Sequence, residues 1–291
     1  MNKRIAVLGV AMCLTACGSL ESIDGGRDSD GIVVGSQAYY SNEVIAEIYA
    51  QALEKAGHKV DRQFQIGQRE VYMAEVENGS IDVFPEYSGP LLQYWKPDTA
   101  ARLPEDVYAE LKSALPDKLQ VLNQAEASDQ DSYVVTQEYS EEHGVTSIQD
   151  LRKVQNITLG ANSEAEDRRP NGPKGLKSVY GVDAAFTPIE DSGGPLTVKA
   201  LKDGDIQLAI IYSADPSIAA NNLVSLKDPK GQFLSSRVVP LASKKLDADA
   251  VAVLNEVNAK LTTQDLIQLN TRSVTEQLPS ALIAKEWLKA H

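Results

Sequence analysis

The stretch Val76–Gly89, VENGSIDVFPEYSG, predicts how one unit of the fold is built. A helix is expected to end at Asn78-Gly79, because glycine adopts the left-handed conformation that closes a helix. The apolar run Ile81–Phe84 then predicts a buried strand, which we expect Pro85 to end because proline cannot donate to a sheet ladder. Glu86-Tyr87-Ser88 follows at the carboxyl end of that strand, where open α/β sheets bind ligands.

The same pattern occurs a second time, in Leu201–Ala214 (LKDGDIQLAIIYSA). A helix tail, Gly204, an apolar strand and Tyr212 follow one another, and eight residues separate the glycine from the tyrosine in both copies. Two like units far apart in the chain predict two like α/β lobes, each with a tyrosine at a strand end. Because helix–glycine–strand sequences are common, the pattern alone leaves open whether these tyrosines bind a ligand or only pack.

The beginning of the chain has the features of a targeting segment. Lys3-Arg4 supply positive charge, and Ile5–Leu14 is an apolar run too short to span a bilayer. Leu14–Cys17 (LTAC) resembles the lipobox of bacterial lipoproteins, which predicts a signal peptide over residues 1–16 and acylation of Cys17. Residues 17–30 are then a lipidated polar tether. The alternative is an ordinary secretory signal in which Cys17 is incidental.

Composition excludes several classes of function. The formal net charge of −13 argues against nucleic acid, whose phosphates need basic patches. Cys13 would leave with the expected signal peptide and Cys17 would be acylated, so the folded part is expected to have no thiol for a disulfide, a zinc site or a nucleophile. The three histidines show no metal-ligand spacing, and no phosphate-binding glycine loop occurs. We therefore predict no cofactor and no metal.

Enzymatic signals are equally poor. Asp82 and Glu86 are a candidate carboxylate pair for glycoside hydrolysis. However, Asp82 interrupts a strand that is expected to be buried, and the sequence names no further acid or base beside the pair. We therefore predict that the protein is not an enzyme.

Tyrosine usage points to a different chemistry. The chain contains 11 tyrosines against 4 phenylalanines, and several of the tyrosines lie at expected strand ends. Aromatic faces that enclose a cation recognise quaternary ammonium groups, with about 0.5–2 kcal/mol per ring depending on desolvation. A single tyrosine is more often a packing residue, but the set favours a cation-binding site.

Three blocks of the sequence resemble the substrate-binding proteins of ABC transporters for glycine betaine, choline and related osmoprotectants. These blocks are Ile66–Gly89, Gly160–Gly181 and Asp191–Ile218, and the resemblance runs from about Gly31 to Trp287. It implies a two-lobed periplasmic-binding-protein-like α/β fold of type II. In that fold, two α/β domains are joined by a two-strand hinge, and a ligand cleft lies between them.

The resemblance also implies a division of the chain and a role. Lobe one is expected at residues 31–131 plus 238–291, and lobe two at residues 132–237. The implied role is that of an extracytoplasmic monomer that captures a small quaternary-ammonium zwitterion and delivers it to ABC permease subunits. Its lipid anchor is the one expected contact with the membrane. The alternatives are another small solute in the same cleft, or a sensor lipoprotein without a transport role.

The resemblance assigns five ligand-binding residues: Gln37, Tyr87, Tyr133, Arg168 and Tyr212. Gln37 holds a loop position where the family usually carries Lys or Gln, and the three tyrosines match members of the cation cage. Arg168 matches the arginine that clamps a betaine carboxylate, through two parallel hydrogen bonds that lysine cannot reproduce. Arg169 is a rival for that role by adjacency.

The chain departs from the family pattern at three positions. The family motif Phe-Phe-Pro-Pro-Tyr corresponds to Gln232–Ser236, so that Ser236 replaces a cage tyrosine. Ala165 replaces the phenylalanine before the clamp arginine, and Pro90 stands where a small polar or acidic residue is usual. A cage that lacks one ring binds a trimethylammonium group less tightly or suits another ligand. The departures therefore leave the identity of the substrate open.

Overall fold

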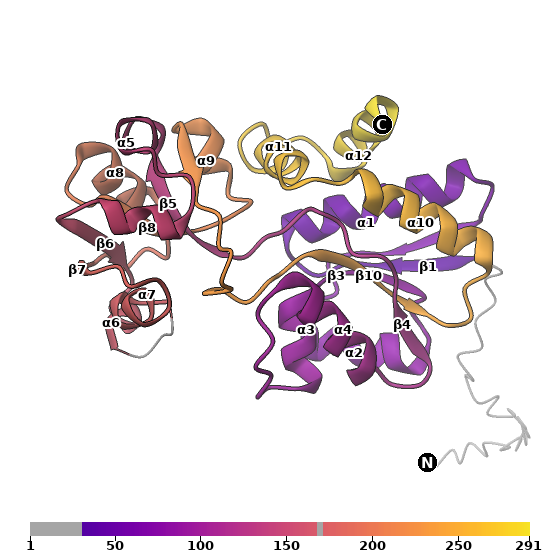
Figure 1. Cartoon of the computed structure of the whole chain (residues 1–291). Coiled ribbons are helices and arrows are strands. Elements are labelled where there is room, and N and C mark those ends of the chain that lie inside the picture. The colour runs from indigo at the N-terminus through magenta and orange to yellow at the C-terminus, as the bar shows by residue number, and fades with distance from the viewer. Residues whose placement is uncertain (1–30, 168–170) are drawn as a thin grey trace, which may run out of the picture.

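The computed structural model describes residues 31–167 and 171–291. The expected signal peptide, Cys17, the tether, Arg168 and Arg169 lie outside these residues. The described chain forms two five-stranded sheets with helices around each, connected by two crossing segments (Figure 1). We call the part built on the first sheet lobe one and the part built on the second sheet lobe two.

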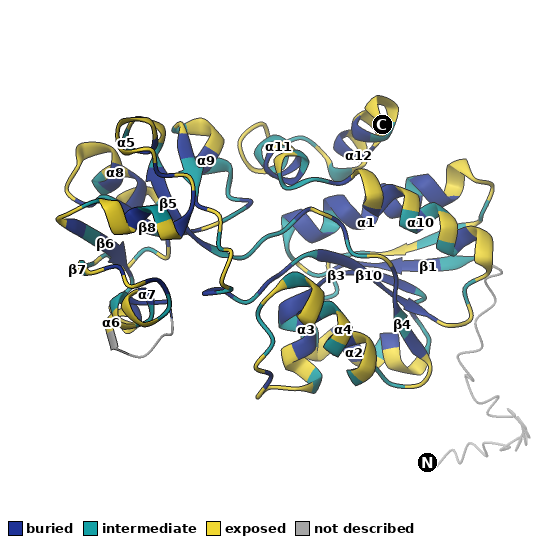
Figure 2. Cartoon of the chain, viewed as in Figure 1, coloured by how far each residue is buried: buried dark blue, intermediate teal, exposed yellow. Residues whose placement is uncertain are grey.

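Lobe one combines the N-terminal part of the described chain with its C-terminal part. Its sheet has the order β2-β1-β3-β10-β4, formed by β1 (Ile32–Gly35), β2 (Val60–Gln63), β3 (Val83–Tyr87), β4 (Leu119–Val121) and β10 (Val238–Ser243). Its helices are α1 (Tyr40–Lys55), α2 (Arg69–Asn78), α3 (Ser88–Trp95), α4 (Pro104–Ala114), α10 (Ala248–Lys260), α11 (Thr263–Val274) and α12 (Ser280–Ala290). Buried residues fill the strands and nearly every side of α1, and the other helices of the lobe each bury one face (Figure 2).

Lobe two is formed by one continuous part of the chain. Its sheet has the order β7-β6-β8-β5-β9, formed by β5 (Asp131–Thr136), β6 (Ile157–Ala161), β7 (Ala184–Pro188), β8 (Leu208–Tyr212) and β9 (Leu223–Ser225). Its helices are α5 (Gln137–His143), the 3-10 helix η1 (Ile148–Lys153), α6 (Glu164–Asp167), α7 (Pro173–Tyr180), α8 (Pro195–Asp203) and α9 (Pro216–Ala220).

The repeated sequence pattern corresponds to equivalent elements in the two lobes. Gly79 ends α2 and Gly204 ends α8 with left-handed backbone angles, φ of +87° and +80°, as the sequence predicts. The strands that follow, β3 and β8, each hold the middle place of their sheet. Tyr87 and Tyr212 are the last residues of these strands, so the prediction of two like units is confirmed.

The expectation that Pro85 ends its strand is wrong. β3 continues through Pro85 to Tyr87, and Pro85 lies opposite Pro240 of the antiparallel strand β10. The Pro85 carbonyl accepts a hydrogen bond from Asn42 Nδ2 (2.8 Å), and the Pro240 carbonyl accepts one from the Leu122 N–H (3.0 Å). Because this position of the ladder needs no donor from either residue, both prolines are tolerated in a central strand pair.

Two adjacent segments connect the lobes, one between β4 and β5 and the other between β9 and β10. They meet in an antiparallel bridge between Ser128 and Arg237. The Asp129 N–H donates to the Ser236 carbonyl (3.1 Å), and the Val238 N–H donates to the Ala127 carbonyl (2.9 Å). This two-stranded connection is the hinge expected for the fold.

No helix in the part of the chain that the structure describes combines the length and the apolarity that a membrane span requires.

Candidate ligand-binding site

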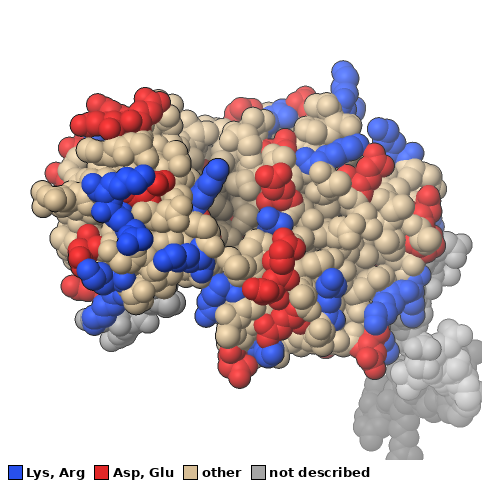
Figure 3. Space-filling view, in the orientation of Figure 1, with Lys and Arg blue, Asp and Glu red and all other residues tan. Residues whose placement is uncertain are grey.

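A cavity of about 500 Å³ lies where the two lobes meet the hinge. Lobe one, the hinge and lobe two all contribute to it. The described residues that line it are Pro90, Gln93, Arg102, Asp129, Gln130, Asp131, Asn171, Tyr212, Gln232, Phe233, Leu234 and Ser236. We call it the hinge cavity. The molecular face in Figure 3 is hollowed between the lobes, and acidic and basic side chains lie beside the hollow.

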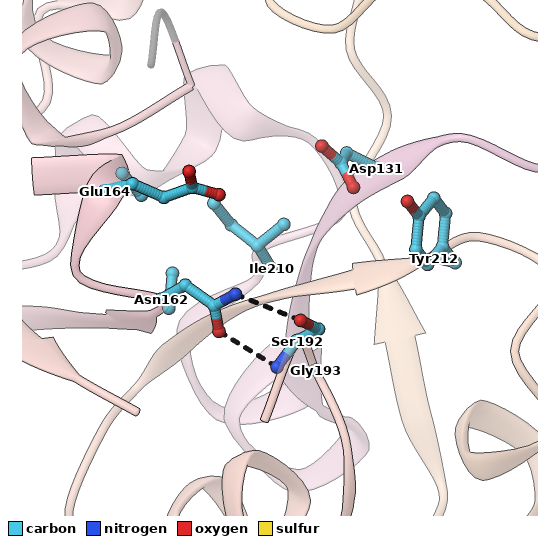
Figure 4. A pocket seen from close by; sticks show the side chains of 9 residues that line it. Asp131, Asn162, Glu164, Ser192, Gly193, Ile210 and Tyr212 are labelled. Carbon is cyan, nitrogen blue, oxygen red and sulfur yellow. Dashed lines mark hydrogen bonds between the residues drawn. The ribbon is translucent and has the colours of Figure 1, made fainter. Parts of the chain in front are cut away.

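A smaller cavity of about 100 Å³ adjoins it on lobe two and shares Asp131 and Tyr212 with it. Figure 4 shows these two side chains beside each other at the smaller cavity, where the β5 and β8 strands run side by side. The opposite wall is held by two hydrogen bonds between Asn162 and Ser192, of 3.0 Å and 2.9 Å. Glu164, from the start of α6, directs its carboxylate into the same space (Figure 4).

Tyr212 is the predicted ligand residue that reaches both cavities. It pairs with Asp131 at the end of the ladder between β5 and β8, and its side chain is 52% exposed. The preceding residue, Ile211, is buried in lobe two. An exposed aromatic ring beside a carboxylate is suited to a cation, because the ring face and the carboxylate both attract positive charge.

Asp129 supplies a second carboxylate, at the hinge itself. Its Oδ2 accepts a hydrogen bond from the Tyr39 hydroxyl (3.2 Å), and its Oδ1 accepts one from the Ala214 N–H (3.3 Å). One side chain therefore connects the beginning of α1 in lobe one with the loop after β8 in lobe two. Burial raises the pKa of Asp129 to about 6, since the cost of desolvating the charge exceeds the benefit of these hydrogen bonds.

Three tyrosines of lobe one lie around Asp129. The rings of Tyr39 and Tyr40 are in contact, with centroids 4.6 Å apart. Tyr87 is 7% exposed, and its hydroxyl hydrogen-bonds to Ser41 Oγ (3.1 Å). Burial, followed by the negative charge of Asp129, raises the pKa of Tyr87 well above its usual range, so the phenol is neutral.

Gln37 and Tyr133 do not line the hinge cavity in the described conformation. The Gln37 N–H donates to Asn42 Oδ1 (2.9 Å), which holds the loop after β1 against α1. Tyr133 is fully buried in the core of lobe two, and its hydroxyl donates to the Asn171 carbonyl (2.6 Å). Its ring makes a T-shaped contact with the ring of Phe233, which does line the cavity, with centroids 4.8 Å apart. The predicted roles of both residues stay predictions.

Arg168 follows directly after α6 and lies outside the described residues. The first residues of α6 line the smaller cavity, and Ala165, one of the three departures, is among them. The other two departures, Pro90 and Ser236, line the hinge cavity. All three departures from the family pattern are therefore at the cavities and not elsewhere on the molecule.

The sequence reasoning missed Arg102, Asp131 and Asn171, which all line the hinge cavity. Asn171 Nδ2 donates to Asp131 Oδ2 (3.1 Å), so these two side chains form one polar unit on lobe two. Asp131 could have been found from the sequence, because it begins the strand that contains Tyr133 and thus follows the crossing segment directly. Arg102 and Asn171 lie in loops, where no periodic pattern assigns them to a face.

Glu86, considered as half of an enzymatic pair, does not line the hinge cavity. It is fully buried in lobe one, where Arg69 donates to it through Nε (2.9 Å) and Nη2 (2.9 Å). The Tyr72 hydroxyl donates to the same carboxylate. Asp82, the other half, accepts from the Val33 N–H (2.9 Å). Among the described residues, no cluster of three or more His, Cys, Asp or Glu side chains is arranged to hold a metal ion.

Comparison with known families assigns the chain. A family model described as the substrate-binding domain of ABC-type glycine betaine transport systems matches residues 30–290. The chain belongs to this family. Its members are binding proteins of transporters, which confirms the prediction that this substrate-binding protein is not an enzyme. Substrate-binding proteins of ABC importers work outside the cytoplasm.

Individual relatives are distant but match almost end to end. The carnitine transport binding protein OpuCC of Listeria monocytogenes is 25% identical over 301 residues, which cover 99% of this chain and 97% of the relative. The glycine betaine-binding protein YehZ of Escherichia coli (strain K12) is 26% identical over 274 residues, which cover 89% of this chain and 90% of the relative.

Solved structures confirm the fold of this substrate-binding protein. Apo YehZ superposes with a TM-score of 0.81 at 25% identity, covering 90% of this chain and 99% of that chain. The structure described as a glycine betaine/carnitine/choline ABC transporter gives a TM-score of 0.79 at 21% identity and covers 89% of this chain and 98% of its own. The two-lobed α/β architecture of type II substrate-binding proteins is thus the fold of this chain.

Proposed function

We propose that this chain is a lipid-anchored receptor that captures a small quaternary-ammonium zwitterion and delivers it to an ABC permease. Family membership supports binding and transport, and the relatives named for carnitine and glycine betaine support this class of ligand. The lipobox pattern at Cys17 supports the anchor. The observation that carries the choice of ligand is the exposed ring of Tyr212 beside the carboxylate of Asp131 in the hinge cavity.

The proposed ligand lies in the hinge cavity with its methylated cation against Tyr212. A trimethylammonium group has no N–H donor, so it is held by ring faces and by nearby negative charge and not by hydrogen bonds. Asp131 and Asp129 supply that charge. Tyr87, Tyr133 and Gln37 remain proposed contacts for the conformation in which the lobes have closed on the ligand. Arg168 remains the proposed clamp for the carboxylate.

A thermal-shift panel tests the proposal with the purified protein. Ligand binding stabilises the folded state by RT ln(1 + [L]/Kd), about 2.7 kcal/mol at a hundredfold excess over Kd, which is visible in a melting curve. Glycine betaine and L-carnitine, which carry both a methylated cation and a carboxylate, should raise the melting temperature most. Choline lacks the carboxylate and should raise it less, and glycine lacks the methyl groups and should do little.

The serine at position 236 supports the alternative that another small solute binds in the same cleft. Ser236 is 4% exposed and lines the hinge cavity where the family motif has a tyrosine, so this position contributes no ring to the cavity. A panel in which no methylated ammonium compound at millimolar concentration shifts the curve, while an unrelated small solute does, would refute the proposed ligand class. It would then favour a changed specificity within the same cleft.

A further inference from the structure

One cation stands out among the described residues that line the hinge cavity. Arg102 comes from the loop between α3 and α4 of lobe one, and it is the single Lys or Arg in that lining, beside the carboxylates Asp129 and Asp131. Arg102 makes no ion pair with a carboxylate of the described chain. The other arginines of lobe one do: Arg62 pairs with Glu47 and Glu54, Arg69 with Glu86, and Arg272 with Glu276 and Glu286.

The Arg102 guanidinium is held in place by the backbone of its own loop. Nη1 donates to the Thr99 carbonyl (3.0 Å) and to the Ala101 carbonyl (2.7 Å). Thr99 is 5% exposed; its Oγ1 donates to Glu110 Oε2 (2.8 Å) and accepts from the Ala101 N–H (3.1 Å). The loop is also tied to the crossing segment, because the Ser235 N–H donates to the Arg102 carbonyl (3.0 Å). The side chain is therefore positioned before any ligand arrives.

The Nε–Nη2 edge of the Arg102 guanidinium is the edge with which other arginines of this protein bind carboxylates. Its Nε and Nη2 make no hydrogen bond within the described chain, whereas Nη1 has two. Arg69 holds Glu86 through Nε and Nη2, both at 2.9 Å. Arg62 holds Glu47 through the same two atoms, at 2.9 Å and 3.1 Å. Two parallel N–H donors match the two oxygens of a carboxylate, so this edge is a complete anion-binding group.

We propose that Arg102 binds the anionic end of the ligand from lobe one, while Tyr212 and Asp131 hold the cationic end from lobe two. This inference rests on the function proposed above and deepens it. A zwitterion in this orientation has one charged end on each lobe and joins the two lobes across the cavity. Arg102 therefore selects zwitterions over ligands that carry the cation alone, in addition to the clamp proposed at Arg168.

The test compares Arg102→Gln with the wild-type protein by isothermal titration calorimetry against glycine betaine, L-carnitine and choline. The variant should raise Kd for the two zwitterions at least tenfold, because a charge-assisted bidentate contact is lost. Kd for choline should change less than twofold, because choline has no carboxylate. Arg102→Lys keeps the charge without the fork and should give an intermediate loss. Arg152→Gln, at an exposed arginine of lobe two, is the matched control and should bind all three as the wild type does.

Three results would overturn the inference, and they are distinguishable. Unchanged zwitterion affinity in Arg102→Gln, with the wild type binding normally, refutes the contact alone. An equal loss of affinity for choline and for the zwitterions would show that Arg102 stabilises the contact between the lobes and does not bind the anionic end of the ligand. If the wild type binds none of the three compounds, the proposed function fails and the inference fails with it. A melting curve within two degrees of wild type for Arg102→Gln shows that the loop is intact.

Discussion

Tyr212 differs from the other predicted cage tyrosines in how much of its ring is open. It is 52% exposed at the hinge cavity, whereas Tyr87 is 7% exposed and Tyr133 is fully buried. A ring that is already exposed can be removed without leaving a void in a core, but its face is lost to the ligand. Tyr212 therefore allows ligand binding to be separated from stability by a single substitution.

Tyr212→Ala should weaken binding of glycine betaine by about 0.5–2 kcal/mol, the value of one cation–π contact, with little change in melting temperature. Tyr212→Phe keeps the ring and should stay close to wild type. Calorimetric titration of the three proteins gives both comparisons. Wild-type affinity in Tyr212→Ala would exclude the ring from the site.

Arg168→Ala should lower the affinity for glycine betaine by about 2–5 kcal/mol, as truncation of one partner of a buried charge pair does. The melting temperature of the ligand-free protein should be nearly unchanged. Arg169→Ala is the matched control and should bind as wild type does. If calorimetry shows that Arg169→Ala loses more affinity than Arg168→Ala, the carboxylate clamp is Arg169 instead.

Asp129 makes the stability of the protein depend on pH in a predictable direction. Its pKa is raised by burial from 3.8 to about 6, so the folded state holds a proton that the unfolded state releases. The stabilisation is present below about pH 4 and is lost as the pH rises through 6, with an upper bound on the order of 3 kcal/mol. The Asp129→Asn variant has no ionisable group at this position, so its stability lacks this pH dependence.

The check is urea unfolding of wild type and Asp129→Asn between pH 4 and pH 7. The free energy of unfolding of wild type relative to the variant should fall across that range. A constant difference would show that Asp129 ionises with an ordinary pKa.

At the scale of elements, local sequence patterns were sufficient to predict where two helices end and that a strand follows each of them. Gly79 and Gly204 end their helices with positive φ, and Tyr87 and Tyr212 end the strands that follow, because helix stops and short apolar runs are local signals. The place of β10 between β3 and β4 was not predictable in this way. That pairing joins residues about 150 positions apart, and it explains why Pro85 continues a strand that it was expected to end.

The side chains of the site show the same limit. β5 is buried at four consecutive positions, so it has no alternation from which to tell whether Tyr133 faces a core or a cleft. The sequence repeat and the family resemblance both pointed to Tyr212, which does reach the cavity, and the resemblance drew attention to Pro90 and Ser236, which line it. It gave no sign of Arg102, because the position of a loop arginine depends on the fold of the two segments that it touches.

Gly89, in the first turn of α3, tests the contact between lobe one and the crossing segment. A Cβ atom on Gly89 would lie 2.3 Å from the Ser235 carbonyl oxygen and 2.7 Å from Leu234 Cγ. Gly89→Ala should therefore lower the free energy of unfolding by about 1–3 kcal/mol through overpacking, although alanine is the better helix former.

Gly79→Ala is the steric control for this prediction. No atom lies within 4 Å of its added Cβ, so its cost of about 1–2 kcal/mol comes from the left-handed backbone alone. Both values are measured by chemical denaturation. A Gly89→Ala variant as stable as wild type would show that the crossing segment yields to the new side chain without cost.

For the whole molecule, the proposed anchor connects the folded lobes to their place of action. Cys17→Ser should release the protein from the membrane fraction into the soluble extracytoplasmic fraction, because the acylated thiol would be lost. Immunoblots of the two fractions, with metabolic labelling by a radioactive fatty acid, measure the change. Equal membrane retention of the variant and the wild type, without label in either, would mean that Cys17 belongs to an ordinary signal.

The position of β10 between β3 and β4 also sets the order in which the lobes can be completed during synthesis. All strands of lobe two come from residues 131–225, whereas β4 pairs with β10 alone among the described strands. A chain that emerges N-terminus first can close the sheet of lobe two while β3 still has an unpaired edge and β4 has no partner. Aggregation-prone edges therefore persist in lobe one until residues 238–243, which form β10, have been synthesised. A nascent chain that stops before residue 238 keeps a complete second sheet and lacks the strand that joins β3 to β4 in the first.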